Sequence, residues 1–284
     1  MRFEPTAVTL LVCAAMAAYL SAAAAFLFRS RRAGLPNGPG AAAPEEWLVA
    51  VGHGWLLYGL GFALALAAFT VRWVQTTHVP MQNLYEVFVV MGMLMLPMSL
   101  FCRAALGVRG EAADALLGLV VLFPVAFVFN PDPQRLPPAL QSPLFVPHVA
   151  VYMASYVILG KAGVQAVWHL AASAARGGTG RAADLERAAH RMVLFGFPLL
   201  TLGLVLGSWW ARLAWDDFWG WDPKELWSLV SWLAFLGYLH FRGRYGGRYA
   251  RVNSALVVAG CVFILITLLW ANLARIFEGL HSYA

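Results

Sequence analysis

Long runs of apolar residues, separated by short polar segments, dominate this chain. A helix needs roughly 20 apolar residues to cross the ~30 Å hydrocarbon core of a bilayer. Such runs lie near residues 5–28, 47–70, 84–102, 113–129, 149–171, 192–210, 225–241 and 253–271. The pattern predicts an all-α polytopic membrane protein with about eight transmembrane helices, forming a single integral membrane domain over residues 1–284.

The composition agrees with this pattern. Of the 284 residues, 61% are hydrophobic and only 12% are charged. A water-soluble domain of this size needs a larger charged surface, so a soluble fold is excluded and the bilayer is expected to surround the chain. The net charge of +6 could indicate a nucleic-acid partner in a soluble protein. In a membrane protein its distribution among the loops matters more, and we expect no nucleic-acid partner.

Basic residues are concentrated in alternate loops. Most of the 20 Lys and Arg residues fall in segments that face inward if the N-terminus faces outward. These predicted inner loops are 29–46, 103–112, 172–191 and 242–252. Because inner loops carry an excess of Lys and Arg, the sequence predicts an N-out, C-out topology. The arginines follow the first apolar run instead of preceding it, so we expect a retained helix and not a signal peptide.

Two segments on the predicted outer side have unusual compositions. The outer loop 130–148 contains six prolines, which predicts a stiff, extended backbone. Residues 209–232 read WWARLAWDDFWGWDPKELWSLVSW and hold seven of the 12 Trp residues of the chain. An aromatic belt at the membrane interface explains some of these rings, but a belt would spread them over both interfaces. A tryptophan-lined shelf suits a flat, apolar, aromatic ligand such as a porphyrin.

The tryptophan segment also carries charged residues. Arg212 and Lys224, together with Arg275 in the tail, are outer cations that could pair with the propionates of a porphyrin. Asp222 and Glu225 flank Pro-Lys in a pattern typical of a helix start, with Asp as the N-cap and Glu completing a capping box. We therefore expect these two acidic residues to begin the next helix and not to act in catalysis. The residues predicted to form the shelf are Trp210, Trp215, Trp219 and Trp221.

Three histidines are candidate axial ligands for haem iron, which binds neutral imidazole well. His148 ends the proline-rich loop and His281 lies in the C-terminal tail, both on the predicted side of the tryptophan segment. Two imidazoles from opposite sides of the shelf could ligate one iron. His240 lies near the inner end of the seventh predicted helix, where an ionisable group is costly and is a functional candidate. Each could instead be an ordinary interfacial histidine, and the tryptophan cluster favours ligation.

Other residues of these types are expected to have different roles. His53 could accompany His240 at a second haem but is predicted to be interfacial, and His169 and His190 are predicted to face solvent near the inner loops. The three cysteines form neither a C-x-x-C nor a C-x-x-C-H motif. This excludes a thioredoxin-type reductase and a covalently attached c-type haem, so we expect packing roles for the cysteines.

The tryptophan segment resembles the WWD signature of haem-handling membrane proteins, over residues 209–227. Within that group, YLHFR after the signature, the terminal LHSYA and the outer VPMQNLYE are similar to the CcsA/ResC branch of the System II cytochrome c synthase. The resemblance extends from about the second predicted helix to the C-terminus. Two positions depart from it, since Asp216 stands where the family usually has Gly and Leu226 where Thr is common.

The resemblance implies a role in cytochrome c biogenesis with haem b as the bound group. It implies that His148 and His281 ligate haem at the outer attachment site and that His240 holds haem during its passage across the membrane. The implied partners are the membrane subunit ResB (also called CcsB), apocytochrome c with its C-x-x-C-H motif, and the lipid bilayer. Such a holocytochrome c synthase (haem lyase) would lie in a bacterial inner (cytoplasmic) membrane or a thylakoid membrane, with its WWD segment on the periplasmic face.

Three other functions remain open from the sequence. A haem-delivery protein of the CcmC or CcmF type also carries the signature, although chains of those types are respectively shorter and far longer. A transporter of another aromatic solute would use the shelf without iron. A structural partner would support ResB without contacting haem.

Overall fold

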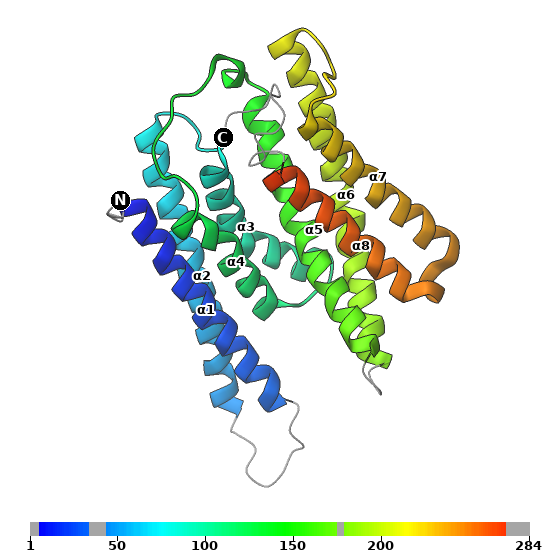
Figure 1. Cartoon of the computed structure of the whole chain (residues 1–284). Helices are drawn as coiled ribbons and strands as arrows, with labels where there is room; N and C mark the ends of the chain where they lie inside the picture. Colours follow the sequence, from blue (N-terminus) through cyan, green and yellow to red (C-terminus); the bar gives the residue numbers. More distant parts are fainter. Residues whose placement is uncertain (1–5, 34–43, 175–178, 271–284) are drawn as a thin grey trace. The chain divides into compact units, whose positions relative to one another are not determined.

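The computed structural model describes residues 6–33, 44–174 and 179–270, and the described chain is helical without strands (Figure 1). The predicted ligand His281 and Arg275 lie outside the described residues. Short 3₁₀ turns occur at Pro138–Leu140 and Gly246–Tyr249, and a π-helical turn occurs at Ile266–Trp270. The helices are α1 (Ala7–Ala33), α2 (Pro44–Thr76), α3 (Leu84–Ala105), α4 (Glu111–Phe127), α5 (Phe145–Ala174), α6 (Thr179–Trp215), α7 (Pro223–Tyr245) and α8 (Ala250–Leu265).

The all-α membrane fold is confirmed, whereas the number of eight spans is approximate. Within the described part of the chain, six helical segments are long and apolar enough to cross a membrane. The last of them, Pro223–Leu269, includes both α7 and α8, which the turn Gly246–Tyr249 separates. Helix α4 has 17 residues and is short for a span. The N-out, C-out topology stays a prediction.

Several helices extend beyond the apolar runs that predicted them. Most of the predicted inner loop 172–191 is helical, because α5 continues to Ala174 and α6 begins at Thr179. Residues 184–191 belong to α6. The predicted loop 242–252 likewise includes the end of α7 and the start of α8. The physical reason is that Ala, Arg and Glu have high helix propensity, so a helix continues where hydropathy falls.

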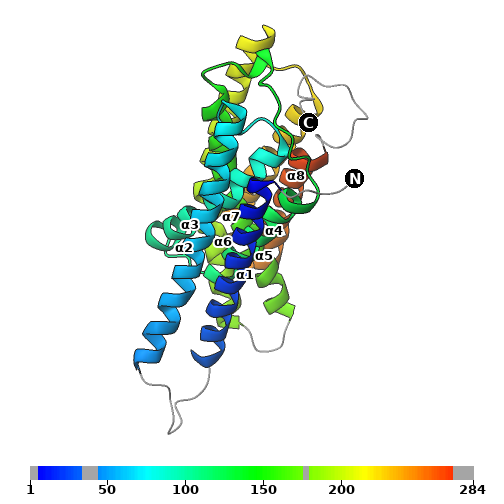
Figure 2. The same ribbon diagram turned by 90° about the vertical axis from the view of Figure 1, so that its left-hand side faces the viewer.

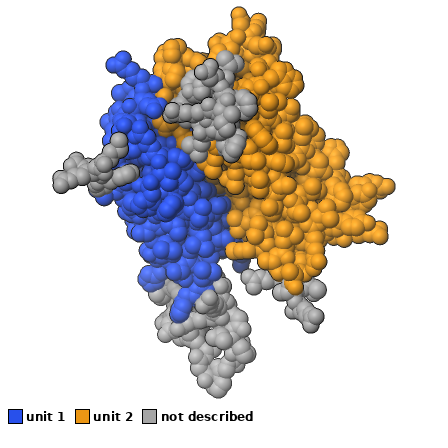
Figure 3. Space-filling model, in the orientation of Figure 1, with its two compact units in different colours: residues 1–80, 85–135 blue, residues 81–84, 136–284 orange. Residues whose placement is uncertain are grey.

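The helices form two compact units (Figure 3). Unit 1 comprises residues 1–80 and 85–135, and unit 2 comprises residues 81–84 and 136–284. In unit 1, α1 packs along α2 and α4, and Figures 1 and 2 both show α1 running beside α2. In unit 2, α5 packs along α6, and α8 packs against α5 and α7. The single integral membrane domain over residues 1–284 stays a prediction.

A buried ion pair in unit 1 anchors the start of the proline-rich loop. Arg72 Nη2 lies 3.0 Å from Glu86 Oε1, and both side chains are almost fully buried. The Arg72 guanidinium also donates hydrogen bonds to the backbone carbonyls of Pro131 and Asp132. Buried charges need such partners because desolvation is expensive. The pair therefore ties the loop to α2 and α3.

A second buried polar cluster joins helices of unit 2. Glu186 of α6 accepts hydrogen bonds from Arg242 Nε at 2.6 Å and Nη2 at 3.2 Å, and from Asn253 Nδ2 of α8 at 2.9 Å. His169 is 2% exposed, with Nδ1 2.7 Å from Ser254 Oγ. The expectation that His169 faces solvent was wrong, because α5 extends far enough to pack its last turns against α8.

Candidate functional site

The start of α7 has the capping structure that the sequence predicts. Lys224 donates its backbone N–H to Asp222 Oδ1 at 2.8 Å, and Asp222 donates its own to Glu225 Oε2 at 3.2 Å. Pro223 occupies the first helical turn, where its missing N–H costs nothing. Glu225 Oε2 also accepts the backbone N–H of Gly220 at 2.8 Å. The capping box thus fixes the end of the loop 216–222 as well as the helix.

The beginning of this loop is held by α6. Asp216 has φ 66°, in the left-handed region that favours glycine and that Asp tolerates better than most residues. Asp216 therefore adopts a backbone conformation that glycine adopts at no steric cost. Arg212 Nη1 lies 3.0 Å from Asp216 Oδ1 and also bonds the Asp216 carbonyl. Ser208 Oγ donates to the Phe218 carbonyl at 2.9 Å. The Arg212 guanidinium, which was predicted to pair with a propionate, is therefore already bonded to the loop.

The four tryptophans of the predicted shelf fall into two pairs. Trp210 is buried, its Nε1 donates to the Ala139 carbonyl at 3.0 Å, and its ring meets Trp215 at 5.0 Å between centroids and 60° between planes. Trp219 meets Trp221 at 6.1 Å and 82°. Trp219 Nε1 is buried and has no hydrogen-bond partner among the described residues, whereas Trp221 is 67% exposed. Trp219 therefore places a buried N–H donor beside the exposed ring of Trp221.

His148 lies in the first turn of α5, against Trp210 of the Trp210–Trp215 pair. Its ring stacks on Trp210 with centroids 5.8 Å apart and planes 30° apart, and it meets Tyr152 edge-on at 5.0 Å. His148 Nδ1 lies 2.9 Å from the Gly203 carbonyl oxygen of α6. A carbonyl can only accept, so Nδ1 carries a proton, and in the neutral ring the lone pair is on Nε2. This is the tautomer in which Nε2 can ligate a metal.

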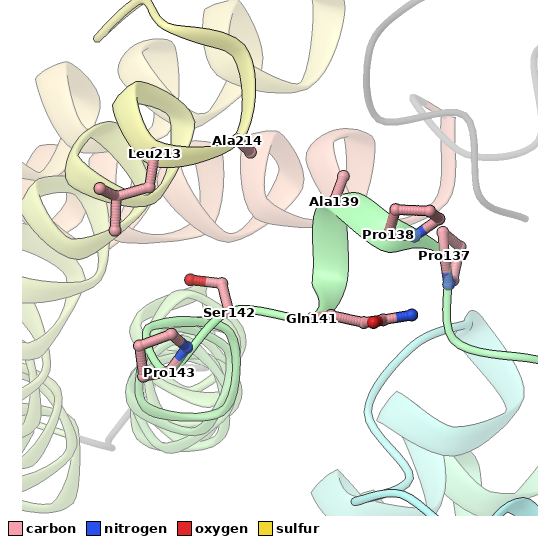
Figure 4. Close-up of a pocket in the computed structure, with 8 residues that line it drawn as sticks. All are labelled: Pro137, Pro138, Ala139, Gln141, Ser142, Pro143, Leu213 and Ala214. Carbon is pink, nitrogen blue, oxygen red and sulfur yellow. The ribbon is translucent and has the colours of Figure 1, made fainter.

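A pocket of about 670 Å³ opens between the proline-rich loop and the last turns of α6 (Figure 4). This volume is within the usual range for small-molecule sites. Trp210 borders the same region, because its indole N–H bonds the carbonyl of the lining residue Ala139. The pocket is lined by Pro137, Pro138, Ala139, Gln141, Ser142, Pro143, Leu213 and Ala214.

The remaining predicted site residues lie elsewhere. His240 is exposed on α7, and its Nδ1 lies 2.9 Å from the Leu236 carbonyl, which again assigns the lone pair to Nε2. Lys224 lies half-buried in the first turn of α7. His53 is exposed on α2, in the other unit. The structure therefore brings His148 together with Trp210 and Trp215, and it places His240 on a separate surface of unit 2.

Three contributors to the His148 environment were missed from the sequence. They are the Gly203 carbonyl, the Ala139 carbonyl and the Tyr152 ring. Tyr152 follows His148 by four residues, so it lies on the same helical face, and this spacing could have identified it. The two backbone carbonyls carry no side-chain signal.

Comparison with known proteins covers most of this chain. The model of the family described as "Cytochrome C assembly protein" matches residues 55–281. A protein named "Cytochrome c biogenesis protein CcsA" from Chlamydomonas reinhardtii is 30% identical, over 80% of this chain and 67% of its own length. Its namesake from Prochlorococcus marinus (strain MIT 9303) is 32% identical over 84% and 87%. The one from Guillardia theta is 32% identical over 75% and 79%. The matched residues include the tryptophan segment and all three candidate histidines.

Proposed function

The chain belongs to the cytochrome c assembly protein family, and on that premise we propose that it binds haem and presents it for covalent attachment to apocytochrome c. Its apolar helices and its CcsA relatives identify it as an integral membrane protein of cytochrome c biogenesis. The resemblance to the CcsA branch is confirmed by these relatives. We place the chain in a bacterial inner membrane or a thylakoid membrane, with the tryptophan segment on the outer face.

The environment of His148 carries the proposal. Its Nδ1 hydrogen bond to Gly203 leaves the lone pair on Nε2, and its ring is fixed between Trp210 and Tyr152. An imidazole with a settled tautomer and a packed ring is what haem ligation needs. The nearby pocket provides apolar walls. His281 supplies the second axial imidazole in this proposal.

The other residues of the site would bind the periphery of the haem. The tryptophan rings cover the porphyrin and keep water away, and the buried Trp219 Nε1 is a donor for a propionate oxygen. Arg212 and Lys224 would contribute positive charge, with Arg212 remaining attached to Asp216. Two axial imidazoles restrain reactions of ferrous haem with oxygen.

Attachment then requires an open vinyl edge. Each cysteine thiol of C-x-x-C-H adds across the C=C bond of one vinyl group. The S–H bond and the vinyl π bond break, sulfur bonds one vinyl carbon and the proton ends on the other. No net oxidation or reduction occurs in this addition. The histidine of the same motif replaces one axial imidazole, which weakens the hold on the haem and allows the product to leave.

His240 would bind haem before it reaches the outer site. Its ring is exposed on α7 with the lone pair on Nε2, so its ligand atom is accessible from outside unit 2. This favours a second ligand from another membrane subunit, and ResB/CcsB is the partner we propose.

The test is the absorption spectrum of the purified protein, with and without the partner subunit. The His148→Gly variant should lose haem and cytochrome c assembly, and added imidazole should restore part of both by filling the vacated space. His53→Gly is the matched control, because His53 is an exposed histidine in the other unit. Full haem retention in His148→Gly would refute the proposal. A protein that never acquires haem would instead favour transport of another aromatic solute or a scaffolding role.

A further inference from the structure

The surface of α6 beneath His148 is formed by two glycines one turn apart. A Cβ atom at Gly207 would lie 2.5 Å from His148 Cε1 and 3.0 Å from its Nδ1. A Cβ at Gly203 would lie 3.0 Å from the Tyr152 ring. The contact of 2.5 Å is shorter than real Cβ atoms show, and the contacts of 3.0 Å require the neighbouring ring to shift by a few tenths of an ångström. The rings of His148 and Tyr152 therefore occupy space that is available because positions 203 and 207 of α6 carry no side chain.

The same two glycines also explain the hydrogen bond of His148. In a helix, the side chain at position i+4 stands over the backbone of position i on the same face. With glycine at position 207, the Gly203 carbonyl is open to α5, and its second lone pair can accept a bond from outside the helix. His148 Nδ1 uses it at 2.9 Å. Tyr152 then meets the imidazole edge-on at 85° and restricts its plane.

We propose that Gly203 and Gly207 are positioning residues that set the tautomer and the ring plane of His148. They touch no haem themselves, and they act by presenting His148 Nε2 as the ligand atom. Without the Gly203 bond, the proton could occupy either ring nitrogen and the ring could rotate away. This inference rests on the proposed function, and it names what organises the same site.

Close helix packing is the simpler explanation, because small residues four apart are common where membrane helices meet. The chain contains a position that separates the two explanations. Gly196 lies on the same helix, and a Cβ there would lie 2.8 Å from Leu159 Cδ2. Gly196→Ala therefore creates a comparable clash with α5 that involves no histidine. At Gly59 of α2, no atom of the described residues outside its own stretch of helix lies within 4 Å of the Cβ position, so Gly59→Ala is a substitution without a clash.

The experiment compares Gly207→Ala, Gly196→Ala and Gly59→Ala in the full chain, purified and loaded with haem. We expect Gly207→Ala to weaken haem retention about tenfold or more, as loss of the groups that orient a metal ligand does. Its absorption spectrum should also shift from the low-spin form with two imidazoles to a high-spin form. Gly196→Ala and Gly59→Ala should keep the low-spin spectrum, even where Gly196→Ala lowers the melting temperature.

Each result decides between explanations. Equal haem loss in Gly196→Ala and Gly207→Ala, or a low-spin spectrum in Gly207→Ala, overturns the positioning role. An unchanged spectrum in His148→Gly overturns the proposed function itself, so the two failures are distinguishable. If Gly207→Ala accumulates poorly, the double variant with His148→Gly should restore its accumulation, because the ring that meets the new methyl group is gone. Failure to restore it counts against the inference.

Discussion

Replacing Glu186 by alanine should destabilise unit 2 far more than a typical substitution does. Glu186 is 6% exposed at its side chain and Arg242 is 16% exposed, so water cannot replace the carboxylate effectively. The substitution leaves the Arg242 guanidinium without its two charge-assisted bonds and removes the oxygen that accepts from Asn253. Breaking a buried pair from one side costs about 3–5 kcal/mol. We expect a loss of unfolding free energy within that range.

The exposed pair Arg187–Asp184 on the same helix is the matched control. Its side chains are 57% and 74% exposed, so Asp184→Ala should change the free energy of unfolding by less than about 1 kcal/mol. Denaturant titration in mixed micelles, followed by tryptophan fluorescence, measures both variants. In the double variant Glu186→Ala with Arg242→Met, much of the lost stability should return, since no buried charge is left alone. A loss below about 1 kcal/mol for Glu186→Ala alone would refute the assignment of a buried ion pair.

Three further substitutions test other parts of the structure. Arg72→Met should cost unit 1 about 3 kcal/mol or more by removing the cation that pairs with the buried Glu86, and should increase protease cleavage in the loop 130–137, whereas an unchanged cleavage rate would contradict the anchoring role. Glu225→Ala should lower the free energy of unfolding by about 1 kcal/mol and speed hydrogen exchange at the Gly220 amide. An unchanged exchange rate at Gly220 in this variant would contradict the hydrogen bond to Glu225. Asp216→Val should lower the melting temperature by an amount corresponding to about 1–2 kcal/mol because φ is 66°, while Asp216→Gly should not; equal behaviour of the two would argue against the left-handed conformation.

The sequence alone determined the features that depend on local order and on hydropathy. Apolar runs predicted a helical membrane protein because the bilayer forces every backbone polar group to pair within its own helix. The helix start at Asp222 was predictable because a capping box involves residues only three apart. The tryptophan segment and the motifs around it identified the family, since that recognition depends on residue types and their order.

The tertiary structure alone decided how distant residues meet. His148 bonds a backbone carbonyl 55 residues away, and no pattern of side chains encodes which carbonyl a packed helix leaves open. The burial of His169 depends on how far α5 continues beside α8, because helix propensity and interhelical contacts set helix length where hydropathy no longer does. Hydropathy determines where the helices form. Contact between helices determines the tautomer of His148, because the carbonyl that a neighbouring helix presents decides which ring nitrogen carries the proton.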